Sequence, residues 1–162
     1  MNLVHANHEF GAVINSESKI LILGSFPSVK SRHLGFFYMH PQNRFWKILS
    51  ELFSDNFLVQ DIDKKSNLLH HFGIALYDVI ENCDISGSKD ASITNVIPAD
   101  IQAMISASKI TKIYLNGKIA FSLFNKHNKE LSCIAHYLPS SSPANATYTL
   151  DKLIEAWKII LD

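Results

Sequence analysis

The segment Gly35–Leu49, GFFYMHPQNRFWKIL, places aromatic and hydrogen-bonding residues at close spacing. Three consecutive aromatics precede a His-Pro pair, and Asn43, an arginine and a tryptophan follow. A ring can stack on a planar ligand, and an amide can both donate and accept hydrogen bonds. The mixture predicts a surface that is apolar, flat and polar at once. The ordinary structural alternative, rings packed over a helix start with Asn43 as a local cap, stays equally open.

Two loops have a composition that suits ligand binding. GSFPSVKS (24–31) follows one apolar run, and LPSSSPAN (138–145) follows another. Small residues let backbone N–H groups approach a ligand closely, and hydroxyl groups suit contacts to phosphate. A plain turn explains the first loop equally well, and a loop that caps the last helix explains the second one better.

Several other chemistries lack their motifs. GxGxxG, GxxxxGK[ST] and GxSxG are absent, which argues against a nucleotide cofactor and a serine nucleophile. Cys83 and Cys133 are 50 residues apart, so they form neither a disulfide framework nor a metal-binding pair. We expect no metal and no cofactor. Asp78 near a strand end is a candidate general base, although a structural role is favoured, as it is for His40 and His136.

Alternating strands and helices must position these residues. Short apolar runs predict buried strands at 19–24, 74–80, 111–117 and 133–139. Helical patterns follow Pro41, with His40 as the expected N-cap, and then Pro98 and Gly117. A last helix is expected over 148–161. This order predicts an α/β fold, a three-layer α/β/α domain with a central, mainly parallel four-stranded sheet. Ligands then bind at the carboxyl ends of the strands.

The charge pattern is segregated although the net charge is zero. Residues 18–50 hold five Lys or Arg and no acid, residues 101–129 hold five lysines and no acid, and nine of the fifteen acids fall within 51–100. Segregation can form a basic face for nucleic acid on a neutral protein. Chance clustering on solvated surfaces is the alternative.

Length and hydropathy give the remaining expectations. We expect one domain over 1–162, a monomer with no obligate protein partner. No apolar run reaches 18 residues, so no membrane association is expected. The start, MNLVHANHEF, lacks a basic leader with an apolar stretch. With two distant cysteines, this favours a cytoplasmic, reducing compartment.

GSFPSVKS, GFFYMHPQNRFWKIL and LPSSSPAN together resemble the uracil-DNA glycosylase superfamily, most closely its hypoxanthine-DNA glycosylase (deoxyinosine glycosylase) branch. The central YDVIENCDISGSKDASITN is similar to the same branch, so the resemblance spans roughly residues 19–145. HPQNRFW is also similar to the mismatch-specific uracil glycosylases. The resemblance implies a base-excision repair enzyme whose partner is DNA with a damaged base, flipped out of the duplex and hydrolysed from its sugar.

Two positions depart from the superfamily pattern. Phe26 and Leu138 stand where many members carry polar residues. In the hypoxanthine branch the asparagine of the HPxN segment takes over the role of these polar residues. That asparagine is Asn43 here. An amide orients water but cannot deprotonate it. The motifs place no lysine where it could form a Schiff base with the sugar. The resemblance therefore implies hydrolysis without lyase activity.

The resemblance also implies the remaining site residues. Tyr38 stacks on the flipped base, Ser25 and Phe26 line the pocket with their backbone, and the other positions shape the pocket or hold the DNA backbone. The residues expected to bind substrate are Gly24, Ser25, Phe26, Pro27, Ser28, Tyr38 and His40. Those expected to bind DNA are Arg44, Lys47, Ser140, Ser141, Ser142 and Pro143. A structural role for Arg44, as a cap or in a pair, stays equally open.

Three alternatives remain at this point. A mismatch-specific uracil or thymine glycosylase shares the fold, and pocket size does not follow from sequence. A DNA-binding module without catalysis is the alternative from another class, and substrate turnover separates it. An unrelated α/β hydrolase is disfavoured because no nucleophile–base pattern is visible.

Overall fold

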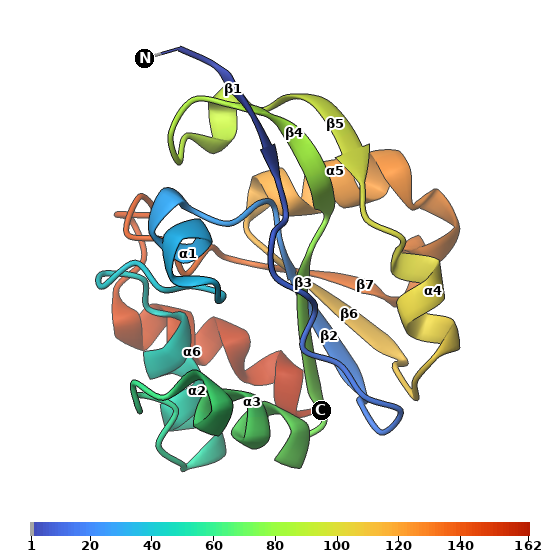
Figure 1. The fold of residues 1–162 in the computed structure, drawn as a ribbon. Coiled ribbons are helices and arrows are strands. Elements are labelled where there is room, and N and C mark those ends of the chain that lie inside the picture. The colour runs from blue at the N-terminus through green and yellow to red at the C-terminus, as the bar shows by residue number, and fades with distance from the viewer. Residues whose placement is uncertain (1) are drawn as a thin grey trace.

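The computed structural model describes residues 2–162. Its central sheet contains β2 (Ile20–Gly24), β3 (Ile74–Asp78), β6 (Lys112–Asn116) and β7 (Ala135–Leu138) in the order β3-β2-β6-β7. Every pairing is parallel, so the carboxyl ends of the strands lie along one edge. Figure 1 shows this sheet between two groups of helices. The predicted α/β architecture with four parallel strands is therefore confirmed.

Alternating strand residues explain the layers, because successive side chains point to opposite faces of a sheet. Leu21 and Leu23 pack on one face, and Ile22 packs on the other. The Ile22 face is covered by α2 (Phe45–Phe53), α3 (Ile62–His71) and α6 (Leu150–Trp157), and the opposite face by α4 (Ile101–Ser106) and α5 (Lys118–His127). Burial on both faces accounts for the continuous apolar runs in the sequence.

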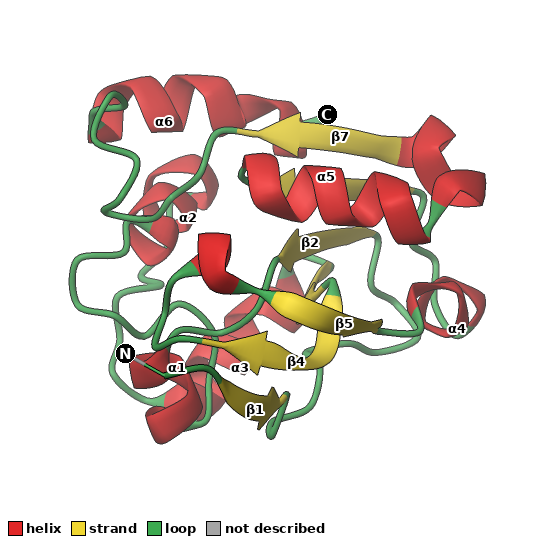
Figure 2. Ribbon diagram, turned by 90° about the horizontal axis from the view of Figure 1, so that it is seen from above, coloured by secondary structure: helices red, strands yellow, loops and turns green. Residues whose placement is uncertain are grey.

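A second sheet, absent from the sequence-based prediction, continues from β3. It is antiparallel and consists of β1 (Val4–Asn7), β4 (Ile80–Ile85) and β5 (Thr94–Pro98) in the order β1-β4-β5. Figure 2 shows these strands side by side next to the short helix α1 (Val29–Leu34). The chain leaves the central sheet at Asp78 and enters β4 two residues later. The expected strand 74–80 therefore contains the end of one strand and the start of another.

Several element ends also differ from the predictions. The helix expected after His40 begins at Phe45, because Asn43 accepts the Phe45 N–H in a turn that satisfies the first free donor. The fourth strand starts at Ala135, after the 3₁₀ helix Lys129–Ile134. The final helix continues as a 3₁₀ turn over Lys158–Leu161, and another 3₁₀ turn covers Asp90–Ser92.

Strand order fixes the place where a ligand can bind. The chain proceeds from β2 to β3 on one side and later returns to β6 on the other side of β2. Open α/β sheets bind ligands where the strand order reverses, outside the carboxyl ends. Gly24 ends β2 and Asn116 ends β6, so these residues border that point. No helix within residues 2–162 is long and apolar enough to cross a membrane.

Candidate active site

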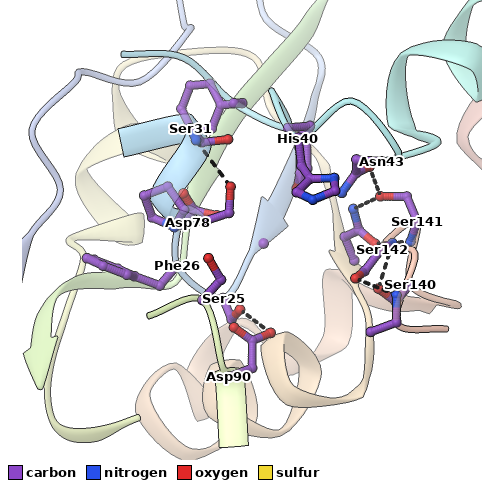
Figure 3. Close-up of a pocket in the computed structure, with 18 of the residues that line it drawn as sticks. Ser25, Phe26, Ser31, His40, Asn43, Asp78, Asp90, Ser140, Ser141 and Ser142 are labelled. Atoms are coloured by element: carbon purple, nitrogen blue, oxygen red, sulfur yellow. Dashed lines mark hydrogen bonds between the residues drawn. The ribbon is translucent and has the colours of Figure 1, made fainter. Parts of the chain in front are cut away.

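A cavity of about 290 Å³ opens at this strand edge (Figure 3). The sequence predicted most of its lining, which includes Asn43, all seven substrate-binding candidates and four of the six DNA-binding candidates. Arg44 and Lys47 are not among the lining residues. The lining residues that were not among the predicted binding residues are Ser31, Phe37, Asp78, Ser88, Asp90, Asn116 and Ala144, and of these only Asp78 was considered as a candidate, for a general base.

The Asn43 amide has a fixed orientation. Its Oδ1 accepts the Phe45 N–H at 3.0 Å and the Ser141 hydroxyl at 2.9 Å. Ser141 Oγ in turn accepts from Asn116 Nδ2 at 2.9 Å, so its own hydrogen is available to Asn43. Figure 3 shows the bond between Asn43 and Ser141. Because both donors hold the oxygen, the NH₂ group is the part of Asn43 that is left to face the cavity.

Arg44 holds the loop that contains the serines. The Nε and both terminal nitrogens of its guanidinium donate to the backbone carbonyls of Ser141, Ser142, Asn145 and Tyr148. A planar guanidinium suits such a fork of acceptors. Four of the five N–H groups of Arg44 are thus engaged within the protein, which favours the structural alternative, and phosphate binding by Arg44 stays a prediction. Lys47 is exposed on α2, and a role in DNA binding stays a prediction for it.

The serine loop is shaped by internal hydrogen bonds. Ser141 is fully buried, so its hydroxyl holds Asn43 and does not reach a phosphate, contrary to the sequence-based expectation. Ser140 Oγ accepts the Ser142 N–H at 3.1 Å. Gly117 approaches this loop with φ of 102°, and a Cβ there would lie 3.1 Å from Ser140 Cβ. The partly exposed Ser142 and exposed Pro143 remain at the cavity rim.

The aromatic turn packs under the cavity. Trp46 Nε1 donates to the carbonyls of Phe37 and Tyr38, both at 3.2 Å, and the Tyr38 ring stacks on Phe45 with centroids 4.1 Å apart. Tyr38 has a φ of 54°, which is uncommon for a bulky residue. Its buried hydroxyl has no hydrogen-bond partner in residues 2–162. Burial, with the charge of Asp78 second, raises the pKa of Tyr38 above its usual range.

Two carboxyl groups line the opposite side. The Ser25 hydroxyl donates to Asp90 at 2.8 Å. Burial raises the pKa of Asp90; the Ser25 hydrogen bond opposes this rise, and the charge of Asp78 adds to it. Asp78 pairs with Gly24 in the β2–β3 register and binds His8 Nε2 through Oδ2 at 2.7 Å.

Comparisons with known proteins agree with this geometry. The family model of the uracil DNA glycosylase superfamily matches residues 12–160. This chain belongs to that superfamily. A protein of Methanosarcina acetivorans named hypoxanthine DNA glycosylase is 30% identical over 152 residues, which cover 93% of this chain and 95% of the relative. A hypoxanthine DNA glycosylase of Methanosarcina barkeri is 31% identical over 84 residues, or 52% of this chain and 53% of the relative.

A solved structure supports the same superfamily assignment. It is a solution NMR structure of a candidate uracil DNA glycosylase from Methanosarcina acetivorans, with a TM-score of 0.79 and 27% sequence identity. The match covers 94% of this chain and 97% of that one. The predicted membership of the superfamily and the predicted fold are thus confirmed.

The two departures from the superfamily pattern have packing explanations. The Phe26 ring is 7% exposed and joins the core under the second sheet, with Ile80, Cys83 and Ile85. Figure 3 shows this side chain pointing away from the other labelled cavity residues. Leu138 is fully buried in the core below α2 and α6. Apolar side chains at both positions therefore stabilise the fold, and the polar chemistry of the cavity comes from other residues.

Two of the lining residues outside the predicted set, Asp78 and Asn116, carry one signal, which is their place at a strand end. Asp78 follows the apolar IALY, and Asn116 follows KIYL. Carboxyl ends of parallel strands meet at one edge, so polar residues there are candidates for a site. His8, by contrast, lies outside the cavity and outside every motif that was recognised.

Proposed function

We propose that this protein is a monofunctional DNA glycosylase that hydrolyses the N-glycosidic bond of a flipped, deaminated base, with hypoxanthine in deoxyinosine as the preferred base. The observation that carries the proposal is the Asn43 amide, whose oxygen is held by Phe45 and Ser141 at the edge of the superfamily's cavity. The name of the relative from Methanosarcina acetivorans, which matches over nearly the full length, supports hypoxanthine as the base.

The proposed step begins with a nucleotide flipped into the cavity. The bond between the base and C1′ breaks with its electron pair leaving on the base, so the sugar becomes oxocarbenium-like. Water then adds to C1′, and the proton that this water releases neutralises the departed base. Asn43 can donate from its NH₂ group to the oxygen of that water, which fixes the water without removing its proton. Positioning and electrostatic stabilisation then provide the rate acceleration. Asp78 and Asp90 can oppose the positive charge that develops on the sugar.

The rim of the cavity is the proposed DNA contact. Ser142, Pro143 and Ser140 belong to the loop that Arg44 holds, so Arg44 acts on DNA through the shape of this loop. Backbone N–H groups and hydroxyls of such a loop can bind phosphate oxygens. Tyr38 is proposed to form part of the surface on which the base stacks, which is worth about 1–3 kcal/mol per base.

A cleavage assay tests this function. Matched duplexes with one hypoxanthine, uracil, thymine mismatch or xanthine are treated with the wild type, Asn43→Ala and the neighbouring exposed control Gln42→Ala, and abasic sites are then cleaved with alkali. We expect cleavage mainly at hypoxanthine, lost by about 10²–10³-fold in Asn43→Ala alone. Cleavage mainly at uracil would assign the protein to the mismatch-specific enzymes, and tight binding without cleavage would make it a DNA-binding module.

The finer aspects of the proposal have separate tests. Lyase activity needs an amine that forms a Schiff base, so borohydride should trap no covalent complex with an abasic duplex. We propose that residues 1–162 act as one domain and as a monomer, which light scattering of the purified chain measures. We also propose a cytoplasmic location, supported by two cysteines that are both free thiols.

A further inference from the structure

His8 and Asp78 form a buried pair beside the cavity. The His8 side chain is 0% exposed and that of Asp78 is 4% exposed. The second sheet brings them together, because the β1–β4 ladder continues to a bond from His8 N to the carbonyl of Glu81, close to the point where the chain leaves β3. The ring centroids of Tyr77 and Phe10 lie 4.3 and 4.6 Å from the centroid of the imidazole. Water is therefore excluded from the imidazole. The two polar partners of His8 determine which of its ring nitrogens carry a proton.

The hydrogen bonds fix the positions of the protons. His8 Nδ1 lies 2.8 Å from the carbonyl oxygen of Phe10, which can only accept, so Nδ1 carries a hydrogen. His8 Nε2 lies 2.7 Å from Asp78 Oδ2, and two lone pairs would repel at that distance, so one proton lies between them. That proton belongs either to an imidazolium or to a carboxylic acid. In both states Asp78 Oδ1 carries no proton and can only accept.

Asp78 Oδ1 lies at the floor of the cavity. A Cβ on Gly24 would be 2.5 Å from it, and both residues line the cavity. Within residues 2–162 no donor forms a hydrogen bond to this oxygen. An acceptor that lines the cavity without a protein donor is available to a ligand. This oxygen therefore suits an N–H group from a ligand in the cavity.

We propose that the His8–Asp78 pair makes the cavity floor a hydrogen-bond acceptor. This acceptor selects deaminated bases, which have an N–H beside a carbonyl, over the bases from which they arise, which have a lone pair at that nitrogen. Hypoxanthine carries a hydrogen on N1 beside its carbonyl, whereas adenine has a lone pair at N1. Because the base is attached to the sugar at one fixed atom, the N–H and the carbonyl always occur in the same order along the edge that enters the cavity. The inference rests on the proposed function and names the group that the site reads; Asp78 contacts the base, and His8 positions Asp78.

Substitution by asparagine separates this role from proton transfer. In Asp78→Asn the amide NH₂ can donate to His8 Nε2, which leaves the amide oxygen facing the cavity. The acceptor then persists without the carboxylate. A residue that removes a proton from water would lose its function in this variant, whereas a residue that reads an N–H would keep it. Asp78→Ala removes the acceptor in either case.

The experiment measures binding to duplexes that contain 2′-fluoroarabino hypoxanthine or adenine at one position. The fluorine destabilises the sugar cation, so the base stays attached. We expect the wild type to prefer hypoxanthine by about 10- to 100-fold, as a hydrogen-bond acceptor left without its donor predicts. Asp78→Asn should keep most of that preference, and Asp78→Ala should reduce it to within about threefold. Matched controls are Asp84→Asn and Asp84→Ala, in the exposed His5–Asp84 pair on the second sheet.

His8→Phe tests the positioning role, because phenylalanine fits among the neighbouring rings but holds no proton for Asp78. Its preference should fall toward that of Asp78→Ala. Equal preference of the wild type for both bases would overturn the proposal, and so would an Asp78→Asn variant as unselective as Asp78→Ala. If Asp78→Ala fails to fold, the preference of the wild type and of Asp78→Asn for hypoxanthine over adenine still tests the proposal. Selective binding by a wild type that leaves unmodified deoxyinosine intact would refute the proposed function and retain this inference.

Discussion

The two sides of the cavity differ in chemistry. The side at β6 and β7 is a neutral network in which Asn116, Ser141 and Asn43 bond in sequence through amides and a hydroxyl. The side at β2 and β3 contains two carboxyl groups, of which Asp78 is bound to His8. Neutral groups can orient water, and charged groups can stabilise a cation or read an N–H. Under the proposed roles, positioning of water and recognition of the base are separated in space.

The neutral side depends most on Arg44. In Arg44→Met the carbonyls of four loop residues lose their charged donor, and we expect the free energy of unfolding to fall by about 2–4 kcal/mol. Arg44→Lys should not restore stability, because an ammonium cannot reproduce the planar fork. Denaturant unfolding of both variants measures this. Full stability of Arg44→Lys would show that a single charge suffices.

The charged side depends on the absence of a side chain at Gly24. In Gly24→Ala the new Cβ would meet Asp78 Oδ1 at 2.5 Å and the Tyr38 hydroxyl at 3.0 Å, so Asp78 must move while His8 holds its other oxygen. We expect a loss of about 1–3 kcal/mol in stability, together with weaker selection for hypoxanthine. Thermal unfolding and the binding assay above measure the two effects. The exposed Gly11, where a Cβ meets nothing within 4 Å, provides the control Gly11→Ala.

Ser141→Ala is expected to act on the neutral side alone. Asn43 Oδ1 loses one of its two donors, and Asn116 Nδ2 loses its acceptor. The amide of Asn43 is then less firmly oriented, so cleavage should slow by about tenfold, in line with about 1 kcal/mol for one hydrogen bond. Preference between hypoxanthine and adenine in binding should stay unchanged. A change in that preference would mean that the two sides of the cavity are coupled.

The sequence predicted the neutral side far better than the charged one, for a physical reason. Asn43 and Ser141 are 98 positions apart, but each lies within a short motif that the sequence analysis singled out. His8 and Asp90 were not singled out, and their bonds to Asp78 and Ser25 depend on how distant segments pack. These contacts need the second sheet, whose short strands were missed because β4 begins two residues after β3 and β5 is largely exposed.

An effect outside the cavity provides a reference for stability. Lys65 is buried, its Nζ donates to the carbonyl of Phe57 at 2.6 Å, and burial lowers the pKa of Lys65 to about 8. Between this value and its ordinary value the unfolded chain holds a proton that the folded chain has released. The contribution of Lys65 to stability therefore rises with pH in this window, by less than about 1.4 kcal/mol per unit.

The comparison of two variants measures this dependence. The difference in unfolding free energy between the wild type and Lys65→Met should move in favour of the wild type from pH 8 to pH 10. Lys64→Met, at the exposed neighbouring position, should show no such trend. A pH-independent difference for Lys65→Met would mean that the folded and unfolded chains bind that proton equally.

The account depends above all on Asn43 as a donor to water, and Asn43→Asp tests this most directly. A carboxylate can still accept from Phe45 and Ser141, but it presents an acceptor to the cavity in place of the NH₂ group. The measurement is the single-turnover rate of hypoxanthine release from a deoxyinosine duplex, at saturating enzyme. We predict a loss of about 10²-fold or more, similar to that of Asn43→Ala. A rate equal to or above that of the wild type would contradict the account, because it would mean that the residue at position 43 acts by accepting a proton from water.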